Sequence, residues 1–290
     1  MPRRPPAPLL VLGSVVSVQV GQAVGKQAFG LVEPAGVVTL RLGFAALVLL
    51  AFWRPRLPTD VRSAGLVVAF GTAIAGMNLV YPALQYLPLG VATSLQLLGP
   101  LAVALAGSRR PRHVAWALLA CAGVLLIGRP WAGPLPVAGM LLALASGAAM
   151  GLYLLLSRRA GAAAADGGTL ALAITWAAAV SLPFGVPASG ADLLRPPVLA
   201  VGLAVALLSA VLPYSLDLAA LRRLPPRTVG VLESLEPVVG ALAGLVLLAE
   251  VLGPAQWLAI AAITAAAAGA VGSAPSDPAA RRARAEPGTA

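Results

Sequence analysis

The sequence has few residues that could carry charge, bind a metal or act as a nucleophile. Only 10% of its 290 residues are charged and 5% are aromatic, and it has one cysteine and one histidine. A soluble domain has about 25% charged residues, so this composition excludes an ordinary soluble fold. A single cysteine with a single histidine makes neither a disulfide within the chain nor a zinc site. We therefore expect no metal and no cofactor.

Apolar residues are abundant instead. They make up 59% of the chain, and the mean hydropathy is +0.91. This pattern predicts an all-α integral membrane protein, because an apolar helix of about 20 residues crosses a hydrocarbon core ~30 Å thick. Ten transmembrane helices are predicted, at residues 8–30, 35–53, 62–83, 88–107, 113–129, 135–157, 168–187, 197–220, 227–248 and 253–272.

The net charge of +10 comes from short arginine clusters between the apolar spans. Such clusters are typical of the cytoplasmic loops of membrane proteins, so we expect no nucleic-acid partner. If successive loops alternate sides, one side receives only Arg129 and Arg195. The other side receives Arg3, Arg4, Arg54, Arg56, Arg62, Arg109, Arg110, Arg112, Arg158, Arg159, Arg222, Arg223, Arg227, Arg281, Arg282 and Arg284. Both termini are therefore predicted to be cytoplasmic.

Two stretches in different halves of the chain are similar. Residues 87–107 read LPLGVATSLQLLGPLAVALAG, and residues 224–244 read LPPRTVGVLESLEPVVGALAG. Each stretch has two prolines twelve positions apart: Pro88 and Pro100 in the first, Pro225 and Pro237 in the second. An odd number of predicted spans separates the stretches, which gives them opposite orientations. We therefore predict two inverted five-helix repeats, residues 1–130 and 131–272, followed by a disordered cytoplasmic tail, residues 273–290.

The second stretch contains the most unusual residues of the chain, Glu233 and Glu236. Glu236 is expected ~14 Å past Arg227, near the middle of the hydrocarbon core. A carboxylate at this depth costs at least ~2.5 kcal/mol and indicates a functional site. Pro237 has no N–H, so the carbonyl of Glu233 loses its helical partner. Proline-interrupted segments at matching positions of two halves are typical of a transporter binding site, and we predict helix breaks at Pro100, Pro213 and Pro237.

Other polar residues inside the predicted spans complete the candidate site. Gln19, Gln22 and Lys26 are spaced by three and four residues, so they share one face of the first span. The remaining candidates are Asn78, Gln96, Tyr214 and Asp217. Some have a structural alternative. Gln19, Gln22 and Asn78 could be hydrogen-bond partners between helices, typically worth ~0.6 kcal/mol each, and Asp217 could form a salt bridge with Arg222.

Three basic residues, Lys26, Arg41 and Arg227, are candidates for gating or charge pairing. Lys26 lies near the outer end of its span, where it could extend to the membrane surface or pair with Glu33. Arg41 lies ~9 Å inside the outer boundary. Because arginine keeps its proton, a structural ion pair is the expected role of Arg41. We expect Glu250 to be solvated in an outer loop, and Tyr81 to belong to the aromatic belt at the membrane surface.

Several segments resemble one family of transporters. These segments are LPYSLDLAALRRLPPRTVGVLESLEPVVGALAG (residues 212–244), GMNLVYPALQYLPLG (residues 76–90) and GPLAVAL followed by Ser-Arg-Arg-Pro (residues 99–111). They resemble the drug/metabolite transporter superfamily, in its two-repeat EamA branch, and within it the bacterial threonine/homoserine exporters. The resemblance implies functional roles for Asn78, Tyr214, Asp217, Arg227 and Glu236. Gln96 stands where the resemblance implies a glutamate, and Glu233 where it implies an apolar residue.

The sequence thus predicts a secondary active transporter rather than an enzyme. The main hypothesis is a proton-coupled exporter of small amino acids or related metabolites, working by alternating access in the bacterial inner membrane. The expected partners are a small-molecule substrate, protons, the lipid bilayer and a possible second copy of the chain. Two alternatives stay open: an EamA-type exporter of a drug or another metabolite, such as a sugar phosphate or nucleotide, and an integral-membrane enzyme that modifies lipid. No GxxxxGK[ST] loop for nucleotide binding is present.

Overall fold

The computed structural model describes residues 6–106, 111–127, 136–160 and 167–273, and all regular secondary structure in these residues is helical. Eight helical stretches in this part of the chain are long and apolar enough to cross a membrane. This confirms the predicted all-α membrane protein. Two further apolar helices are shorter, Leu89–Leu105 and His113–Leu126, so the count of ten spans stays a prediction. The predicted disordered tail lies outside the described residues from residue 274 onward.

The helices in chain order are α1 (Ala7–Gln27), α2 (Pro34–Trp53), α3 (Val61–Met77), α4 (Val80–Ala83), α5 (Leu89–Leu105), α6 (Pro111–Ile127), α7 (Val137–Ala160), α8 (Gly167–Ser189), α9 (Pro196–Ala206), α10 (Leu212–Leu221), α11 (Pro226–Glu233), α12 (Glu236–Leu248) and α13 (Pro254–Ser273). Five of them, α2, α6, α9, α11 and α13, begin at a proline, which suits the first helical position because the N–H there has no helical partner.

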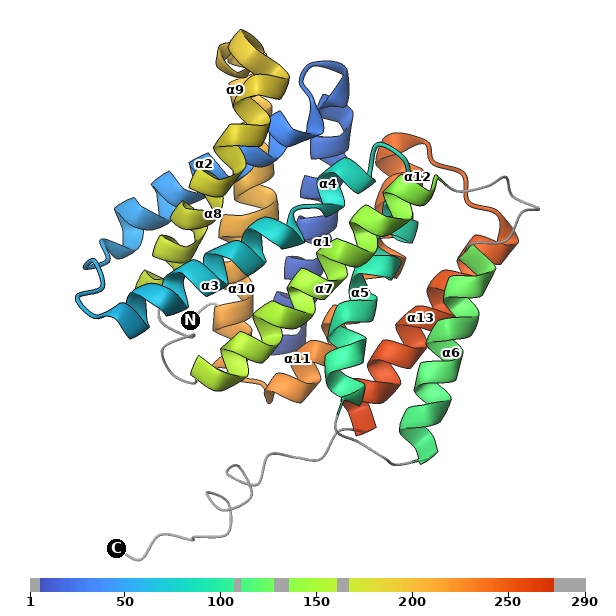
Figure 1. Ribbon diagram of the computed structural model, residues 1–290. Coiled ribbons are helices and arrows are strands. Elements are labelled where there is room, and N and C mark those ends of the chain that lie inside the picture. Colours follow the sequence, from blue (N-terminus) through green and yellow to red (C-terminus); the bar gives the residue numbers. More distant parts are fainter. Residues whose placement is uncertain (1–5, 107–110, 128–135, 161–166, 274–290) are drawn as a thin grey trace, which may run out of the picture.

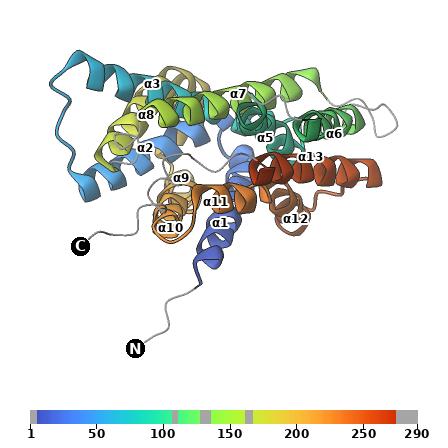
Figure 2. The ribbon, with the colours of Figure 1, turned by 90° about the horizontal axis from the view of Figure 1, so that it is seen from below.

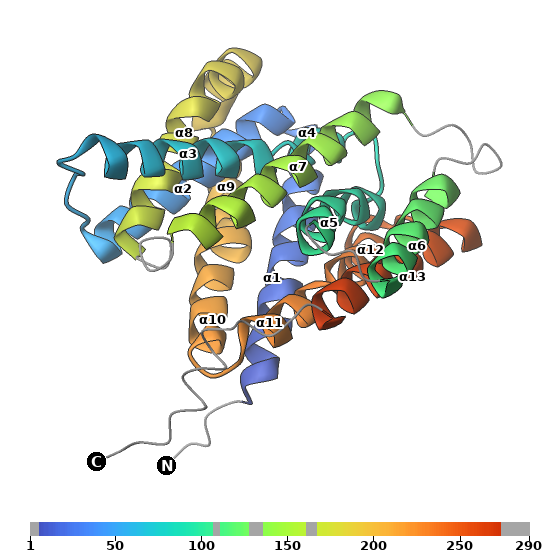
Figure 3. The ribbon, with the colours of Figure 1, turned by 60° about the horizontal axis from the view of Figure 1, so that its bottom comes forward.

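The helices form two groups with α1 between them (Figure 1). In one group α8 packs against α2 and α3, and in the other α5 and α6 pack against α13 and α5 also contacts α12. The long helix α7 joins the groups by contacting both α3 and α5. From below, α1 lies in the middle of the molecule (Figure 2), where it contacts α9, α10, α11 and α12. The start of α1 and the end of α13 lie on the same side (Figures 1 and 3).

Glycines allow α5 and α7 to pack backbone against backbone. A methyl group added at Gly99 would overlap the carbonyl of Gly147, and one at Gly147 would lie 2.6 Å from the carbonyl oxygen of Gln96. That carbonyl is the one that Pro100 leaves without a helical partner. Because α7 covers it, α5 runs on through Pro100 as a single helix from Leu89 to Leu105. The predicted helix break at Pro100 is therefore wrong.

The helix does stop at Pro237. α11 ends at Glu233, and α12 begins at Glu236 with Pro237 in its first turn. A second departure from α-helical geometry is the π turn Leu207–Val211, which immediately precedes Pro213 in α10. Both irregular segments lie inside stretches of membrane-spanning length. Irregular backbone at this depth occurs only where protein covers it or where it lines a watery cavity, so these two segments locate the candidate site.

Candidate functional site

The interruption between α11 and α12 places two carboxylates next to each other in the chain's interior. Glu233 ends α11 and Glu236 begins α12, and both side chains are half-buried. Their carboxylates interact electrostatically with each other and with Asp217 of α10. No basic side chain of the described residues forms an ion pair with any of the three. The structure therefore brings three predicted site residues together as a cluster of acids, with no paired cation among the side chains that it describes.

The middle of α1 contributes amides to the same region. Gln19 is fully buried, and neither its amide nitrogen nor its oxygen has a hydrogen-bond partner among the described residues. Its oxygen lies against α12, because a methyl group at Gly240 would come within 2.7 Å of it. Gln22 is also buried, and its oxygen has no partner there either. Each buried polar group without a partner costs about 1–3 kcal/mol, so a ligand or water that bonded these amides would stabilise the site.

Asp217 faces α1 rather than the loop that follows α10. One carboxylate oxygen accepts a hydrogen bond from Ser14 at 2.8 Å, and the other is buried without a partner among the described residues. No ion pair joins Asp217 to Arg222, so the salt bridge considered from the sequence does not form. A second bond runs from Ser17 of α1 to the carbonyl of Leu208 in the π turn, at 2.5 Å. The acid therefore lies where α1 meets the π turn and α10.

Gln96 has a structural role in the bundle. Its amide nitrogen donates to Ser146 of α7 at 2.7 Å and to the carbonyl of Met77 at 3.2 Å. Ser146 in turn donates to the same carbonyl at 2.5 Å. These bonds join α3, α5 and α7. Gln96, a candidate for the substrate site, thus has its amide nitrogen occupied by bonds between helices.

Arg41 of α2 bonds only neutral groups among the described residues. Its guanidinium donates to the hydroxyl of Ser209 at 2.6 Å, the carbonyl of Ser209 at 2.8 Å and the side-chain oxygen of Asn78 at 2.6 Å. The ring of Tyr81 lies 5.6 Å from the guanidinium carbon, and Tyr81 is 1% exposed. Two expectations are therefore wrong. Arg41 has no carboxylate partner in the described part of the chain, and Tyr81 is a core residue rather than a belt aromatic.

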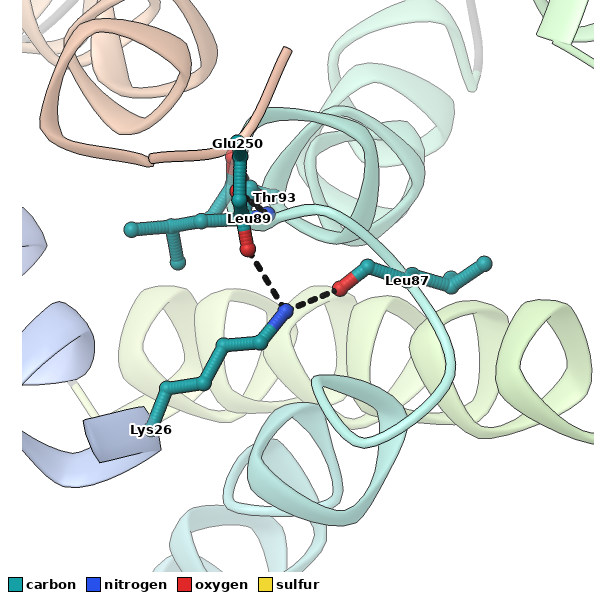
Figure 4. Close-up of polar contacts among 5 residues, drawn as sticks. All are labelled: Lys26, Leu87, Leu89, Thr93 and Glu250. Carbon is teal, nitrogen blue, oxygen red and sulfur yellow. Dashed lines mark hydrogen bonds and ion pairs between the residues drawn. The ribbon is translucent and has the colours of Figure 1, made fainter. Parts of the chain in front are cut away.

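Lys26 closes the opposite end of α1, with a partner different from the expected one (Figure 4). Its ammonium lies 2.6 Å from Glu250 and donates to the carbonyl of Leu87 at 2.7 Å. The other oxygen of Glu250 accepts from the N–H of Leu89, the first residue of α5, at 2.8 Å. The expectation of a solvated Glu250 is therefore wrong. Glu33, considered as the partner of Lys26, instead accepts a 3.4 Å hydrogen bond from the amide of Gln85.

Two further predicted residues add little to the geometry. The side chain of Arg227 lies outside the described residues, although its backbone belongs to α11. Pro213 lies in the first turn of α10, directly after the π turn. The sequence pattern missed Ser209, the residue of the π turn to which Arg41 binds. Its only signal was a small polar residue inside an apolar run.

The arrangement can bind and move charge. The acids can accept a proton or bind a cation. Arg41, which is permanently charged, can bind an anion. Tyr214 of α10 is close enough to both Arg41 and Asp217 to interact with them electrostatically. The described part of the site therefore offers groups for both ends of a zwitterion.

The chain is similar in sequence to known transporters. The profile of the EamA-like transporter family matches residues 137–272. The threonine/homoserine exporters RhtA of Escherichia coli strain K12 and Salmonella typhimurium strain LT2 are each 40% identical over 262 residues, which is 88% of this chain and 88% of theirs. The uncharacterized transporter YwfM of Bacillus subtilis is 26% identical over 223 residues, 76% of this chain and 69% of its own.

The fold also occurs in a solved structure. A crystal structure with 23% sequence identity aligns with a TM-score of 0.56 and covers 98% of this chain and 99% of that chain. At this identity the match speaks for the fold alone.

Proposed function

Because the chain belongs to the EamA-like transporter family, we propose that it exports small amino acids such as threonine or homoserine in exchange for protons. It is a multi-pass protein of the bacterial inner membrane. The observation that carries the proposal is its 40% identity, over 88% of the chain, to threonine/homoserine exporters. The three interacting carboxylates at the break between α11 and α12 supply groups that can take up and release protons.

The transport cycle alternates access to this site. Two inverted repeats, residues 1–130 and 131–272, tilt against each other, and the whole chain crosses the membrane ten times with both termini in the cytoplasm. Lys26 and Glu250 hold the outer ends of the halves together, because their ion pair joins α1 to the loop after α12. Opening to the outside separates this pair. Opening to the inside separates α1 from α10, where Ser14 bonds Asp217.

Protons supply the driving force in this cycle. One charge that crosses a potential of 100 mV releases ~2.3 kcal/mol. Since ~1.4 kcal/mol corresponds to a factor of ten, one proton per cycle can sustain a substrate gradient of roughly fiftyfold. Glu236 takes up the proton from outside, which favours one orientation, and loss of the proton inside favours the other.

A small zwitterion suits the charges of this site better than a sugar phosphate or a nucleotide. Such anions would need several basic groups in the cavity. Lys26 is already paired with Glu250, and among the described side chains Arg41 is the one other basic candidate of the site. The export of anions and the modification of lipid are therefore not favoured, and a homodimer stays a prediction.

Reconstitution of the purified protein into proteoliposomes tests the proposed substrate. An imposed pH gradient is expected to drive labelled threonine and homoserine against their concentration gradients, and a protonophore to abolish this accumulation. Labelled glucose 6-phosphate, in matched vesicles, is expected not to move. If the sugar phosphate accumulates and neither amino acid does, the substrate assignment is wrong.

A further inference from the structure

Arg41 is a charged side chain held deep within an apolar helix by a fixed set of neutral acceptors. It is half-buried and lies eight positions into α2. The side-chain oxygen of Asn78 that accepts its bond is itself fixed, since the amide nitrogen of Asn78 donates to the carbonyl of Ile74 at 2.7 Å. The hydroxyl of Ser209 is oriented in the same way by its own bond to the carbonyl of Val205, at 2.6 Å. The guanidinium is thus held in one position.

The π turn prepares this position. In a π turn the backbone bonds run from residue i+5 to residue i, which is the pattern of the bond from Leu212 to Leu207. The carbonyl of Ser209 accepts instead from Arg41 at 2.8 Å. Helix α1 reaches the same turn closely, because a methyl group added at Gly21 would lie 2.8 Å from the β-carbon of Ser209. Arg41 is therefore placed where α1, α2 and the π turn meet.

The bonds within the protein do not use the whole guanidinium. Arginine has five N–H donors, and the described residues accept from three of them, one on each nitrogen. One N–H on each terminal nitrogen is left. Two such donors on one planar group match the two oxygens of a carboxylate.

A structural role alone does not explain a permanent charge at this position. Neutral hydrogen bonds to Asn78 and Ser209 could be made by an uncharged donor, whereas the guanidinium keeps its proton and carries its charge into the membrane. No carboxylate of the described residues lies within 4.0 Å of it. The π turn that holds Arg41 continues directly into α10, which carries Tyr214 and Asp217, and α1 contacts both segments. Tyr214 interacts electrostatically with both Arg41 and Asp217.

We propose that Arg41 binds the carboxylate of the transported amino acid through its two remaining N–H groups. This inference rests on the proposed function and adds the group that recognises the anionic end of the substrate. Tyr214 and the acid cluster then face the ammonium end. Asn78 and Ser209 are positioning residues that hold the guanidinium in place.

The test compares L-threonine with L-threoninol, in which a hydroxymethyl group replaces the carboxylate. Both are used as competitors of labelled threonine counterflow in proteoliposomes. For the wild type, threonine is expected to compete at a concentration at least about tenfold lower than threoninol, since hydrogen bonds to a charged group are worth a factor of ten or more. Equal competition by the two compounds would overturn the inference.

Two variants at the same position sharpen the comparison. Arg41→Gln is expected to raise the concentration at which threonine competes by about tenfold to a hundredfold. The concentration for threoninol is expected to stay within about twofold of the wild-type value, because only threonine loses a charged partner. Arg41→Lys keeps the charge without the planar pair of donors. Its competition by threonine is expected to lie between those of the wild type and Arg41→Gln. If the glutamine variant does not fold, the lysine variant carries the test.

Two outcomes separate the inference from the proposed function. An equal loss for both competitors in the Arg41 variants would show that Arg41 only supports the structure, while wild-type threonine export would still stand. Failure of the wild type to move threonine or homoserine at all would overturn the proposed function and this inference together.

Discussion

The ammonium of Lys26 lies 2.6 Å from the carboxylate of Glu250 and joins the last turn of α1 to the loop after α12. Both side chains are largely buried, with 21% and 14% exposed. The pair also fixes the start of α5, since Glu250 accepts from the N–H of Leu89 and Lys26 donates to the carbonyl of Leu87. One ion pair thus connects three segments at the same end of the molecule (Figure 4).

Two substitutions at Glu250 separate the ion pair from the cap on α5. Glu250→Gln removes the charge but keeps an oxygen that can accept from Leu89 N–H. Glu250→Ala removes both, so it is expected to be less stable than the glutamine variant by about 0.5–2 kcal/mol, the usual worth of a helix cap. Thermal unfolding in detergent, followed by tryptophan fluorescence, measures the difference. Equal unfolding midpoints would contradict the cap.

Because α5 and α7 are in backbone contact, substitution of a glycine in that contact is expected to destabilise the protein, whereas substitution of a glycine outside it is not. Gly99→Ala places a methyl group on the carbonyl of Gly147, whereas Gly43→Ala on α2 meets nothing within 4 Å. Overpacking of this kind costs about 1–3 kcal/mol, and the fixed backbone of α7 cannot move aside easily. Gly99→Ala is expected to lower the unfolding midpoint and the yield of folded protein, while Gly43→Ala serves as the matched control. Similar midpoints would contradict the close backbone packing.

Ser209 is expected to affect substrate affinity through Arg41. Ser209→Ala removes the hydroxyl that accepts from the guanidinium at 2.6 Å. Threonine affinity is expected to fall by about tenfold, while the affinity for threoninol stays unchanged. Ser215→Ala is the control, because Ser215 is exposed and bonds only its own helix. Equal effects of the two substitutions would contradict the positioning role.

The cap of α3 predicts a dependence on pH outside the membrane span. Hydrogen bonds from the backbone and hydroxyl of Ser63 lower the pKa of Asp60 below its ordinary value of 3.8. Since the folded state holds the ionised form, the cap's contribution is present above pH 3.8 and is lost as the pH falls through the lowered pKa. Asp60→Asn keeps a capping oxygen without a charge. The difference in midpoint between the two proteins is expected to shrink between pH 6 and pH 3, and a constant difference would contradict this linkage.

The site could be predicted where its signal is local. Pro237, four residues after Glu233, removes a helical hydrogen bond, and the break after Glu233 was predicted from this alone. The same reasoning failed at Pro100, because the carbonyl it frees is covered by Gly147, a residue of another helix. Whether a proline breaks a buried helix thus depends on which neighbour covers the freed group.

Partners of the buried charges could not be predicted for the same reason. Lys26 and Glu250 both lie near helix ends in the sequence, but only the packing of α12 against α1 and α5 brings them together. Arg41 reaches a π turn that no residue pattern announces. The sequence therefore identified most of the charged residues of the site but not the contacts that they make.

The central claim is that Glu236 couples protons to export, and uphill transport tests it most directly. Proteoliposomes with wild type, Glu236→Gln or Asp192→Asn are given a pH gradient, and threonine accumulation and threonine exchange are measured in each. Asp192 is the matched control, because it is an exposed acid at 57%. Wild type and Asp192→Asn are expected to accumulate threonine, while Glu236→Gln is expected to exchange it without accumulation. Accumulation by Glu236→Gln at the wild-type level would show that Glu236 does not couple protons to export.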